Sequence, residues 1–479
     1  MSERTLAANI RRLTFVIALA FLITSLGVGY WTLVAASDLN ADPFNPRLIA
    51  AVRDRPRGKI VDASGRVLAE SVADGDTYRR RYSDGSLAQV VGYASFKYGA
   101  SGAEAAYQGS LIGQDPSDLL GQWKARYLGE RTEPGSVVLG IDPKVQQAAV
   151  AALGGRRGAI VALDPKTGRI LASVSLPSYD ANALVDQQQQ DTAWAQLNDN
   201  KDRPLLNRVA QGLYPPGSTM KIVTAAAALE SGFDPNQKIR VDDPYQADRS
   251  WGDYFVRSSS GAHGDFDMSL AFQRSENIYF AKVGLAIGAQ KLSDMAKKFG
   301  IGHAPALDLA AAKGQLSNRG TVDRPTLLAD TSYGQGELLT SPLQMALVAA
   351  TVGNHGVQVQ PHYATEIRDP KGGVLRTVGG GAGDQIISAA TAAKLTAYLV
   401  LAVEAPGAFA FGARIAGVHV AGKTGTAETP SGSPHGWFVG FAPAEDPQVA
   451  VAVIIENAGQ GGVDAAPLGG AVMRAVLGK

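Results

Sequence analysis

"YPPGSTMK", residues 214–221, places a serine directly behind Pro-Pro-Gly and a lysine three positions after it. The residues that follow, up to Gly232, are mostly good helix formers with apolar residues at helical spacing, so Ser218 is predicted to lie at a helix N-terminus. The unpaired NH groups and the positive dipole end there favour a serine oxygen that must become nucleophilic. Lys221 is one turn further along the same face, where its amine can approach the hydroxyl.

A lysine acts as a base only when its amine is neutral. Burial in a cleft and a nearby cation both lower a lysine pKa from its reference value of about 10.4, and this is the usual route to such a base. The Ser-x-x-Lys pattern is weak evidence by itself, because serine is also an ordinary helix N-cap. The spacing therefore leaves two interpretations open, a catalytic pair and a capped helix.

Two further motifs follow along the chain. "RSENIYFAK" (274–282) places Ser275 and Asn277 as Ser-x-Asn before an apolar helical pattern, and "AGKTGTAE" (421–428) places Lys-Thr-Gly-Thr on a predicted strand. The three ordered motifs are similar to the set carried by serine enzymes of the β-lactamase and penicillin-binding group. They supply a nucleophile, a base, a second hydroxyl and amide, and a strand edge that can bind a carboxylate, which favours the catalytic interpretation.

Strand-like segments lie at both ends of the region that carries these motifs. Residues 158–177 form two apolar runs around Asp-Pro-Lys-Thr-Gly, which is a hairpin signal, and three successive strands are predicted in 417–428, 436–443 and 448–457. Helical segments lie between the two ends, and 467–478 is predicted to close the chain as a helix. The pattern predicts an α+β domain whose terminal segments share one sheet.

A smaller module is predicted before this domain. Residues 57–71 have apolar residues on both sides of an Asp-Ala-Ser-Gly turn and read as a hairpin, and residues 72–135 are Gly-rich and weakly periodic. From residue 136 the pattern changes to a short strand and a helix that opens at Asp142-Pro143. We therefore expect an N-terminal module over 57–135 and a larger domain over 136–479.

The first residues predict a membrane anchor. Residues 13–36 carry no charge over 24 positions, which at ~1.5 Å per residue covers a ~30 Å hydrocarbon core. Three arginines precede this stretch and two aspartates follow it, so the positive-inside rule predicts a cytoplasmic tail over 1–12 and a chain that is extracellular beyond a linker over 37–56. The alternative is a cleaved signal peptide, whose apolar core usually runs only ~7–15 residues.

Composition argues against several partners. Lys plus Arg (45) nearly equals Asp plus Glu (44), so no overall basic surface predicts nucleic-acid binding. The chain has no cysteine, and its six histidines show no zinc-binding spacing. We therefore expect no metal and no cofactor.

Over nearly everything after the linker, the chain resembles the class B penicillin-binding proteins. The likeness is carried by "YPPGSTMK" and by "RGKIVDASGRVLA" (57–69), "GAIVALDPKTGRILASVSLPSYDAN" (158–182), "GQGELLTSPLQMA" (334–346) and "HGWFVGFAP" (435–443). It implies a penicillin-binding transpeptidase fold: an antiparallel sheet flanked by helices, an all-helical part, a smaller N-terminal module and one transmembrane helix. It also implies a serine-type D-Ala-D-Ala transpeptidase that crosslinks peptidoglycan.

The resemblance assigns roles to the motif residues. Ser218 would attack the carbonyl between the two D-alanines of a stem peptide, with Lys221 as its base. Ser275 would relay a proton to the departing D-alanine, and Asn277 would bind the substrate amide and hold Lys221. The strand at Lys423, Thr424, Gly425 and Thr426 would bind the terminal carboxylate, and the backbone NH groups of Ser218 and Thr426 would hold the oxyanion.

The resemblance also implies partners. These are peptidoglycan stem peptides, β-lactam antibiotics bound covalently at Ser218, the membrane, a glycan polymerase and other cell-wall synthesis or division proteins. Residues 57–135 would form a non-catalytic dimerisation or pedestal domain. Two alternatives remain: a β-lactam-hydrolysing or β-lactam-sensing enzyme, although sensors usually carry Ser-x-Val where this chain has Ser-x-Asn, and a division scaffold with a vestigial site.

Overall fold

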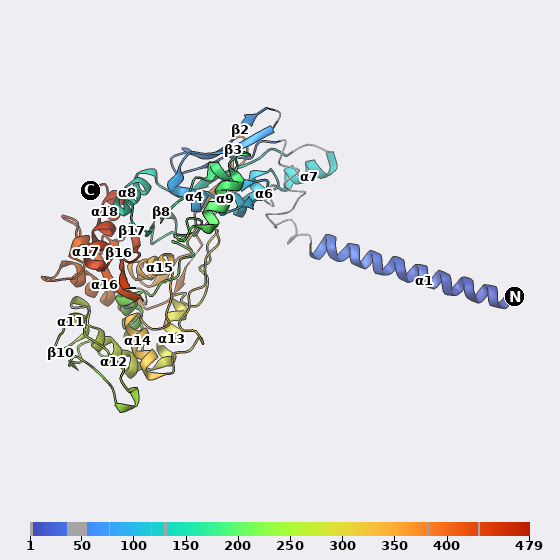
Figure 1. Ribbon diagram of the computed structural model, residues 1–479. Helices are drawn as coiled ribbons and strands as arrows, with labels where there is room; N and C mark the ends of the chain where they lie inside the picture. Colours follow the sequence, from blue (N-terminus) through green and yellow to red (C-terminus); the bar gives the residue numbers. More distant parts are fainter. Residues whose placement is uncertain are drawn as a thin grey trace.

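The computed structural model describes residues 3–35, 55–75, 77–115, 117–128, 132–381, 383–429 and 432–479. Its centre is a five-stranded, fully antiparallel sheet in the order β15-β16-β17-β7-β8, which joins segments from both ends of the larger domain (Figure 1). The strands are β7 (Gly158–Leu163), β8 (Ile170–Leu176), β15 (Ala421–Thr429), β16 (Gly432–Ala442) and β17 (Val449–Ile455). The hairpin and the three C-terminal strands predicted from the sequence are confirmed.

Helices cover both faces of this sheet. Helices α8 (Pro143–Leu153) and α18 (Ala466–Leu477) pack on one face, and α15 (Pro342–Gly353) packs on the other. The strands β7 and β17 are consequently buried along their whole length. Helix α8 begins where predicted, because the Asp142 carboxylate accepts from the NH groups of Lys144 and Val145.

The helical part follows the motif serine. Helix α10 (Lys221–Glu230) is buried from its first residue to Ala228, so it forms the centre around which the other helices pack. The elements around it are α11 (Met268–Gln273), α12 (Asn277–Ile287), α13 (Ala289–Lys298), α14 (Pro325–Tyr333) and α16 (Ala389–Glu404). The alanine-rich sequence of α10 lets its neighbours approach closely, since small side chains leave little space between helices.

A second sheet combines the N-terminal module with strands from far along the chain. Its order is β13-β12-β6-β1-β2-β3, and only β1 and β6 run parallel. The strands are β1 (Ile60–Val61), β2 (Val67–Asp74), β3 (Thr77–Tyr82), β6 (Ser136–Leu139), β12 (Ala364–Arg368) and β13 (Val374–Thr377). The predicted hairpin over 57–71 is confirmed as β1–β2. The predicted boundary at residue 136 falls on β6, which lies inside this shared sheet.

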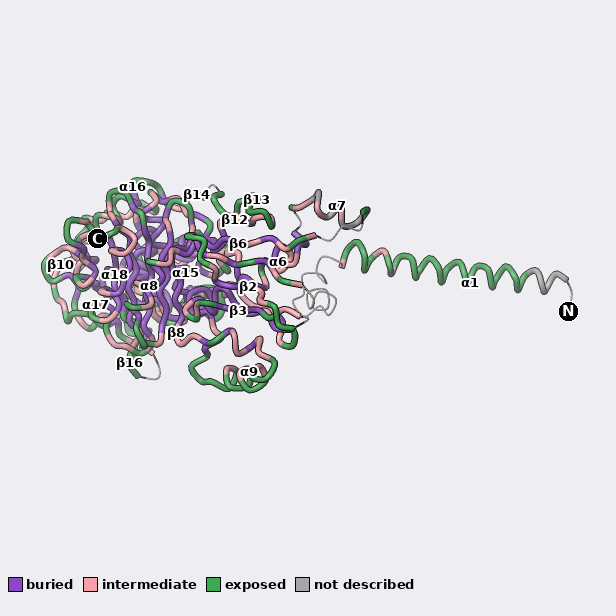
Figure 2. Tube along the Cα trace, turned by 90° about the horizontal axis from the view of Figure 1, so that it is seen from above, coloured by how far each residue is buried: buried purple, intermediate pink, exposed green. Residues whose placement is uncertain are grey.

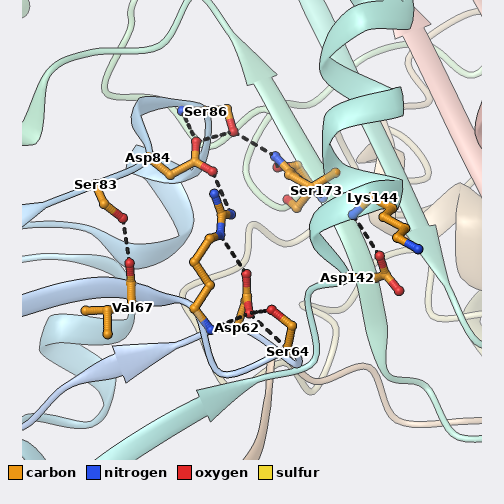
Figure 3. A network of polar contacts seen from close by, with 11 residues as sticks. Asp62, Ser64, Val67, Ser83, Asp84, Ser86, Asp142, Lys144 and Ser173 are labelled. Atoms are coloured by element: carbon orange, nitrogen blue, oxygen red, sulfur yellow. Dashed lines mark hydrogen bonds and ion pairs between the residues drawn. The ribbon is translucent and has the colours of Figure 1, made fainter.

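A polar network ties the hairpin turn to the larger domain (Figure 3). Arg66 bridges the carboxylates of Asp62 and Asp84, each at 2.9 Å. The Ser86 hydroxyl donates to Asp84 over 2.6 Å and accepts from Gln146 of α8 over 3.2 Å. Because Gln146 also bonds the backbone of β8, the module is linked by side chains as well as by strand pairing.

A cluster of buried charged side chains holds the first residues of the N-terminal module in place. The carboxylate of Glu104, which is fully buried, contacts the guanidinium groups of Arg57 and Arg80 at 2.9 and 2.6 Å. These two charge-assisted bonds lower the pKa of Glu104, although its burial acts in the opposite direction. Arg57 precedes β1, so this cluster holds the chain where it enters the second sheet.

The remaining elements are short or lie at the edges. The helices are α4 (Ala88–Val91), α5 (Gly102–Ala106), α6 (Gln108–Leu111), α7 (Leu119–Leu128), α9 (Gln190–Asp199) and α17 (Gly461–Asp464). The strands are β4 (Ala94–Ser95), β5 (Gly99–Ala100), β9 (Ile239–Val241), β10 (Gly264–Phe266), β11 (Val357–Gln358) and β14 (Asp384–Gln385).

The N-terminal helix α1 spans Glu3–Gly29 and continues as one π-helical segment over Tyr30–Val34. Its stretch Ala8–Val34 is long and apolar enough to cross a membrane, and the residues described there are almost all exposed, as the green tube of α1 in Figure 2 shows. The helix includes most of the predicted tail, because no helix breaker separates the two. Residues 37–54 of the predicted linker lie outside the described residues.

Candidate active site

Ser218 lies on a short 3-10 turn, η4 (Gly217–Met220), that leads into α10. Glycine is needed before it: Gly217 has φ +55°, its NH donates to the Gly334 carbonyl over 2.9 Å, and a Cβ there would lie 2.7 Å from the Thr426 carbonyl oxygen. The turn is thereby held between β15 and the residues that follow α14. The predicted position at the mouth of a helix is therefore correct, with a 3-10 turn as the helix entry.

The amine of Lys221 forms the centre of the site. Its Nζ lies 2.9 Å from Ser218 Oγ, 2.7 Å from Asn277 Oδ1 and 2.5 Å from the Ser275 carbonyl oxygen. The Lys221 side chain is fully buried, whereas Ser218 is half-buried and so reaches the surface of the cleft. The structure thus brings together residues of the first two motifs.

Burial lowers the pKa of Lys221 well below its ordinary value, and the charge of Lys423 lowers it further. Glu276 opposes this shift, because its negative charge favours the protonated amine. Burial and the charge of Lys423 outweigh the effect of Glu276, so the pKa of Lys221 is lowered. An amine in this setting can be neutral and can accept the proton of the Ser218 hydroxyl.

Ser275 lies between α11 and α12 with an unusual backbone. Its φ of +53° is rare for a residue with a side chain, and it directs the carbonyl of Ser275 toward Lys221. The hydroxyl of Ser275 accepts from Lys423 over 2.7 Å and lies 3.4 Å from Lys221. Asn277, the first residue of α12, donates from Nδ2 to the Arg257 carbonyl over 3.1 Å, which fixes its amide orientation.

Sequence reasoning missed the loop that supports this motif. Ser259 donates to the Ser275 carbonyl over 2.7 Å, and Ser258 donates to the buried carboxylate of Glu276 over 2.7 Å. Glu276 also accepts from the Ile278 NH and so caps α12. The run of three serines at 258–260 was the available signal, since hydroxyl-rich segments often bond nearby backbone groups.

Strand β15 forms the other wall. Lys423 is buried, and burial lowers its pKa to about 7. Thr424 is also buried, whereas the Thr426 side chain is exposed at the cleft. Gly425 is needed here, because a Cβ would lie 2.8 Å from the Pro216 carbonyl oxygen. Since β15 is the edge strand of its sheet, its outer edge can pair with an extended peptide.

Two aromatic neighbours have packing roles. The indole of Trp437 is fully buried and donates to the Pro215 carbonyl over 2.9 Å, which anchors the chain before Ser218. His435 packs edge-on against the Tyr214 ring and accepts from the Asn457 NH over 3.1 Å. Gln335, which the sequence analysis did not single out as a site residue, donates from its side chain to the Thr426 carbonyl over 3.4 Å.

The described residues contain no group of three or more His, Asp and Glu side chains placed to hold a metal ion. The chemistry available to these residues is that of a serine hydroxyl, two buried amines and backbone NH donors. This combination suits acyl transfer.

Comparisons with known proteins agree with this geometry. Residues 158–474 match the penicillin binding protein transpeptidase domain, and residues 57–137 match the penicillin binding protein A dimerisation domain. The peptidoglycan D,D-transpeptidase PbpA of Mycolicibacterium smegmatis is 36% identical over 498 residues, which cover 98% of this chain and 99% of that protein. PbpA of Mycobacterium tuberculosis is 35% identical over 496 residues, with the same coverage.

Solved structures show the same likeness. The imipenem and penicillin G acyl-enzyme complexes of M. tuberculosis penicillin-binding protein A superpose with TM-scores of 0.81 and 0.80 at 34% identity. They cover 90% and 88% of this chain and 100% of the solved chains. The chain therefore belongs to the class B penicillin-binding proteins. It is a serine-type peptidoglycan D,D-transpeptidase similar over its whole length to mycobacterial PbpA, so the predicted fold and enzyme class are confirmed.

Proposed function

We propose that Ser218 is the nucleophile that accepts the acyl group of a stem peptide and that Lys221 is its general base. The observation that carries this proposal is the 2.9 Å contact between Lys221 Nζ and Ser218 Oγ, made by an amine whose pKa is lowered by burial. Proton transfer to Lys221 accompanies attack of Ser218 Oγ on the carbonyl carbon between the two D-alanines. The oxyanion is held by the backbone NH groups of Ser218 and Thr426.

Collapse of the tetrahedral intermediate breaks the peptide bond and leaves an ester at Ser218. The departing amine of the terminal D-alanine needs a proton, and the Ser275 hydroxyl, which contacts both buried amines, is placed to relay it. The amine of a second stem peptide then attacks the ester carbonyl. Its proton returns through the same groups, and Ser218 is released as the crosslink forms.

The third motif binds the end of the donor peptide. Lys423 supplies positive potential from the buried side of β15, while Thr424 and Thr426 supply hydroxyl groups and Gly425 lets the strand approach closely. A carboxylate bound there leaves the preceding carbonyl over Ser218. We expect β-lactam antibiotics to use the same carboxylate site and to acylate Ser218.

Labelling of the purified extracellular part with a fluorescent penicillin tests these roles. We expect a stable adduct with the wild-type chain and none with Ser218→Ala. Ser231→Ala, a serine at the opposite end of α10, is the control and should label normally. Rapid hydrolytic turnover of the penicillin would identify a β-lactamase instead, and persistent labelling of Ser218→Ala would exclude Ser218 as the nucleophile. Rescue of growth by Ser218→Ala in cells that lack the wild-type gene would favour the scaffold alternative.

We further propose that α1 anchors the chain once in the cell membrane, with residues 1–12 cytoplasmic and the active site extracellular. Support comes from the length and apolar character of Ala8–Val34 and from the arginines that precede it. The alternative of a cleaved signal peptide predicts a mature chain that is released by an alkaline carbonate wash. The anchored chain should stay in the membrane fraction.

A separate glycan polymerase is proposed as a partner, together with other cell-wall synthesis or division proteins. Support comes from the two family matches, a dimerisation domain over 57–137 and a transpeptidase domain over 158–474, neither of which is a polymerase. In membranes supplied with a lipid-linked disaccharide pentapeptide, crosslinked glycan should form only when a polymerase is added. Glycan made by the chain alone would contradict this proposal.

A further inference from the structure

A half-buried carboxylate that none of the three motifs contains lies between two tyrosines near the active site. Asp330, in the last turn of α14, accepts hydrogen bonds at Oδ1 from the hydroxyls of both Tyr254 and Tyr333. The two tyrosine oxygens lie 3.2 Å from each other. Burial raises the pKa of both tyrosines, so both hydroxyls keep their protons and act as donors at neutral pH.

Tyr254 belongs to the loop that supports the second motif. Tyr245 and Val256 pair through two backbone bonds of 2.9 Å, and Gln246 donates to the carbonyls of Gly252 and Tyr254 over 2.6 and 3.1 Å. These contacts make residues 245–256 a compact unit. The next residues, 257–259, are those that hold Asn277, Glu276 and Ser275. The position of Tyr254 therefore bears on the whole Ser-x-Asn motif.

The residues after Asp330 reach the other side of Ser218. The Gln335 NH donates to the Asp330 carbonyl over 2.9 Å, and the Gln335 side chain donates to the Thr426 carbonyl over 3.4 Å. Gly334, between them, accepts from the Gly217 NH over 2.9 Å. This segment therefore contacts the turn that carries Ser218 and the strand that provides the second oxyanion NH.

We propose that Asp330 is a positioning residue of the transpeptidase, which joins the loop behind Ser275 and Asn277 to the segment behind Ser218 and Thr426. The proposal rests on the roles proposed above for these four residues. Asp330 acts through the two tyrosines and the backbone, because its carboxylate accepts their hydroxyls and does not contact Ser218 or Lys221 in the described structure.

The expected consequence concerns the rate of acylation. Without the Asp330 acceptor, the Tyr254 loop keeps only the 3.2 Å contact between the two tyrosine hydroxyls as its side-chain link to this end of α14. The Arg257 carbonyl then fixes the amide of Asn277 less firmly. Lys221 then loses a fixed partner at Asn277 Oδ1. Displacements of about 1 Å in such groups cost up to about 100-fold in rate, so we expect acylation to slow at least about tenfold.

The test compares the second-order rate of acylation by a fluorescent penicillin with the melting temperature, for variants in the otherwise unchanged protein. Asp330→Ala removes the acceptor, Tyr254→Phe removes one donor, and Asp330→Asn keeps a carbonyl oxygen where both hydroxyls bond. The control is Tyr107→Phe, which removes another part-buried tyrosine–aspartate bond, the 2.5 Å contact from Tyr107 to Asp308, away from the active site.

We expect Asp330→Ala and Tyr254→Phe to acylate at least about tenfold more slowly, Asp330→Asn to recover most of the rate, and Tyr107→Phe to lose melting temperature but not rate. If Asp330→Ala fails to fold, the acylation rate of Tyr254→Phe tests the proposal by itself. Wild-type rates in Tyr254→Phe, no recovery in Asp330→Asn, or an equal slowing in Tyr107→Phe would each overturn the proposal. Ser218→Ala in the same assay separates the two proposals: if it still labels, the role of Ser218 is wrong, whatever Asp330 does.

Discussion

The amines of Lys221 and Lys423 face the same hydroxyl, that of Ser275, whose oxygen lies 3.4 Å from Lys221 Nζ and 2.7 Å from Lys423 Nζ. Both amines are buried, so a positive charge on one disfavours a charge on the other. The pKa of Lys423 is lowered to about 7, and that of Lys221 lies well below its ordinary value. The pair therefore titrates as a unit, in which the charge of Lys423 helps to keep Lys221 neutral.

Removal of the Lys423 amine should change the pH dependence of acylation. The neutral, basic form of Lys221 exists above its pKa, so acylation falls as the pH drops through that pKa. Lys423→Met removes a cation, which raises the pKa of Lys221 and moves the acid limb of the rate profile to higher pH. Each unit of this shift lowers the neutral fraction about tenfold on the acid side. Acylation rates at saturating penicillin between pH 5 and 9 measure the shift.

Lys282→Met is the control for this change. Lys282 lies on α12, donates to the Arg240 carbonyl and contacts the Tyr245 ring, away from Ser275. Its removal should leave the acid limb in place. An acid limb that stays at the wild-type pH in Lys423→Met would show that the charge of Lys423 does not set the protonation of Lys221.

Gly334→Ala should displace the turn that carries Ser218. A Cβ at Gly334 would lie 1.8 Å from the Gly217 carbonyl oxygen, and the backbone φ of +92° is strained for alanine. We expect a loss of about 2 kcal/mol or more in the free energy of unfolding, because the strain and the clash add. Penicillin acylation should fall at least about 100-fold, since the turn that carries Ser218 must move. Chemical denaturation and labelling kinetics measure both effects.

Gly232→Ala is the control that separates the effect of backbone strain from the effect of moving the Ser218 turn. Gly232 also has a positive φ, +79°, but a Cβ there would meet no atom within 4 Å. We expect a loss of about 1 kcal/mol and an unchanged acylation rate. Equal acylation in the two glycine variants would contradict the close approach of Gly334 to the Ser218 turn.

Glu104→Gln should destabilise the N-terminal module. Two buried guanidinium groups would lose their countercharge, which costs about 3–5 kcal/mol. Because the folded-state pKa of Glu104 lies below its ordinary value of 4.5, its contribution is present above that value and is lost as the pH falls through the folded-state pKa. The wild-type and variant unfolding free energies should therefore differ most near neutral pH and converge in acid.

The exposed pair of Glu70 and Arg81 provides the comparison. Glu70→Gln removes a charge on neighbouring strands of the same sheet, but the guanidinium of Arg81 is well exposed. We expect a change below about 1 kcal/mol at every pH. Urea unfolding curves of both variants, recorded from pH 3 to 8, measure the contrast. A large effect of Glu70→Gln would show that burial does not govern these pairs.

The proposed membrane topology can be tested by introducing single cysteines, because the chain has no cysteine of its own. Gly155→Cys lies after α8 at an exposed position with open space around it, and Ser2→Cys lies before α1. A membrane-impermeant maleimide should label Gly155→Cys in intact cells and should label Ser2→Cys only after lysis. Labelling of Ser2→Cys in intact cells would reverse the orientation.

The contact between Ser218 and Lys221 could be predicted because it depends on short-range geometry. A helix places positions 218 and 221 on one face whatever surrounds it. The continuous apolar run over 449–455, bounded by polar residues, predicts a buried strand without knowledge of its partners. The order of the three motifs then indicated a single cleft. The structure places Ser218, Lys221, Ser275, Asn277 and Lys423 in one hydrogen-bonded group.

What could not be predicted depends on contacts between distant segments. The composition changes near residue 136, yet β6 pairs with β1 on one side and with β12 on the other, and no local pattern specifies such partners. The support that Ser258 and Ser259 give to the second motif has the same origin. Asp330 was not singled out, because an aspartate in a helix is usually solvated and only the fold brings Tyr254 to it.

The second sheet has a mechanical consequence for a crosslinking enzyme. Its strands β12 and β13 come from the catalytic part, whereas β1, β2 and β3 come from the N-terminal module over 57–135. A rotation of one part against the other would break the hydrogen bonds that join β1 to β6 and β6 to β12, so this pairing resists a hinge motion at the junction. A force exerted on the module would therefore displace the module and the cleft together.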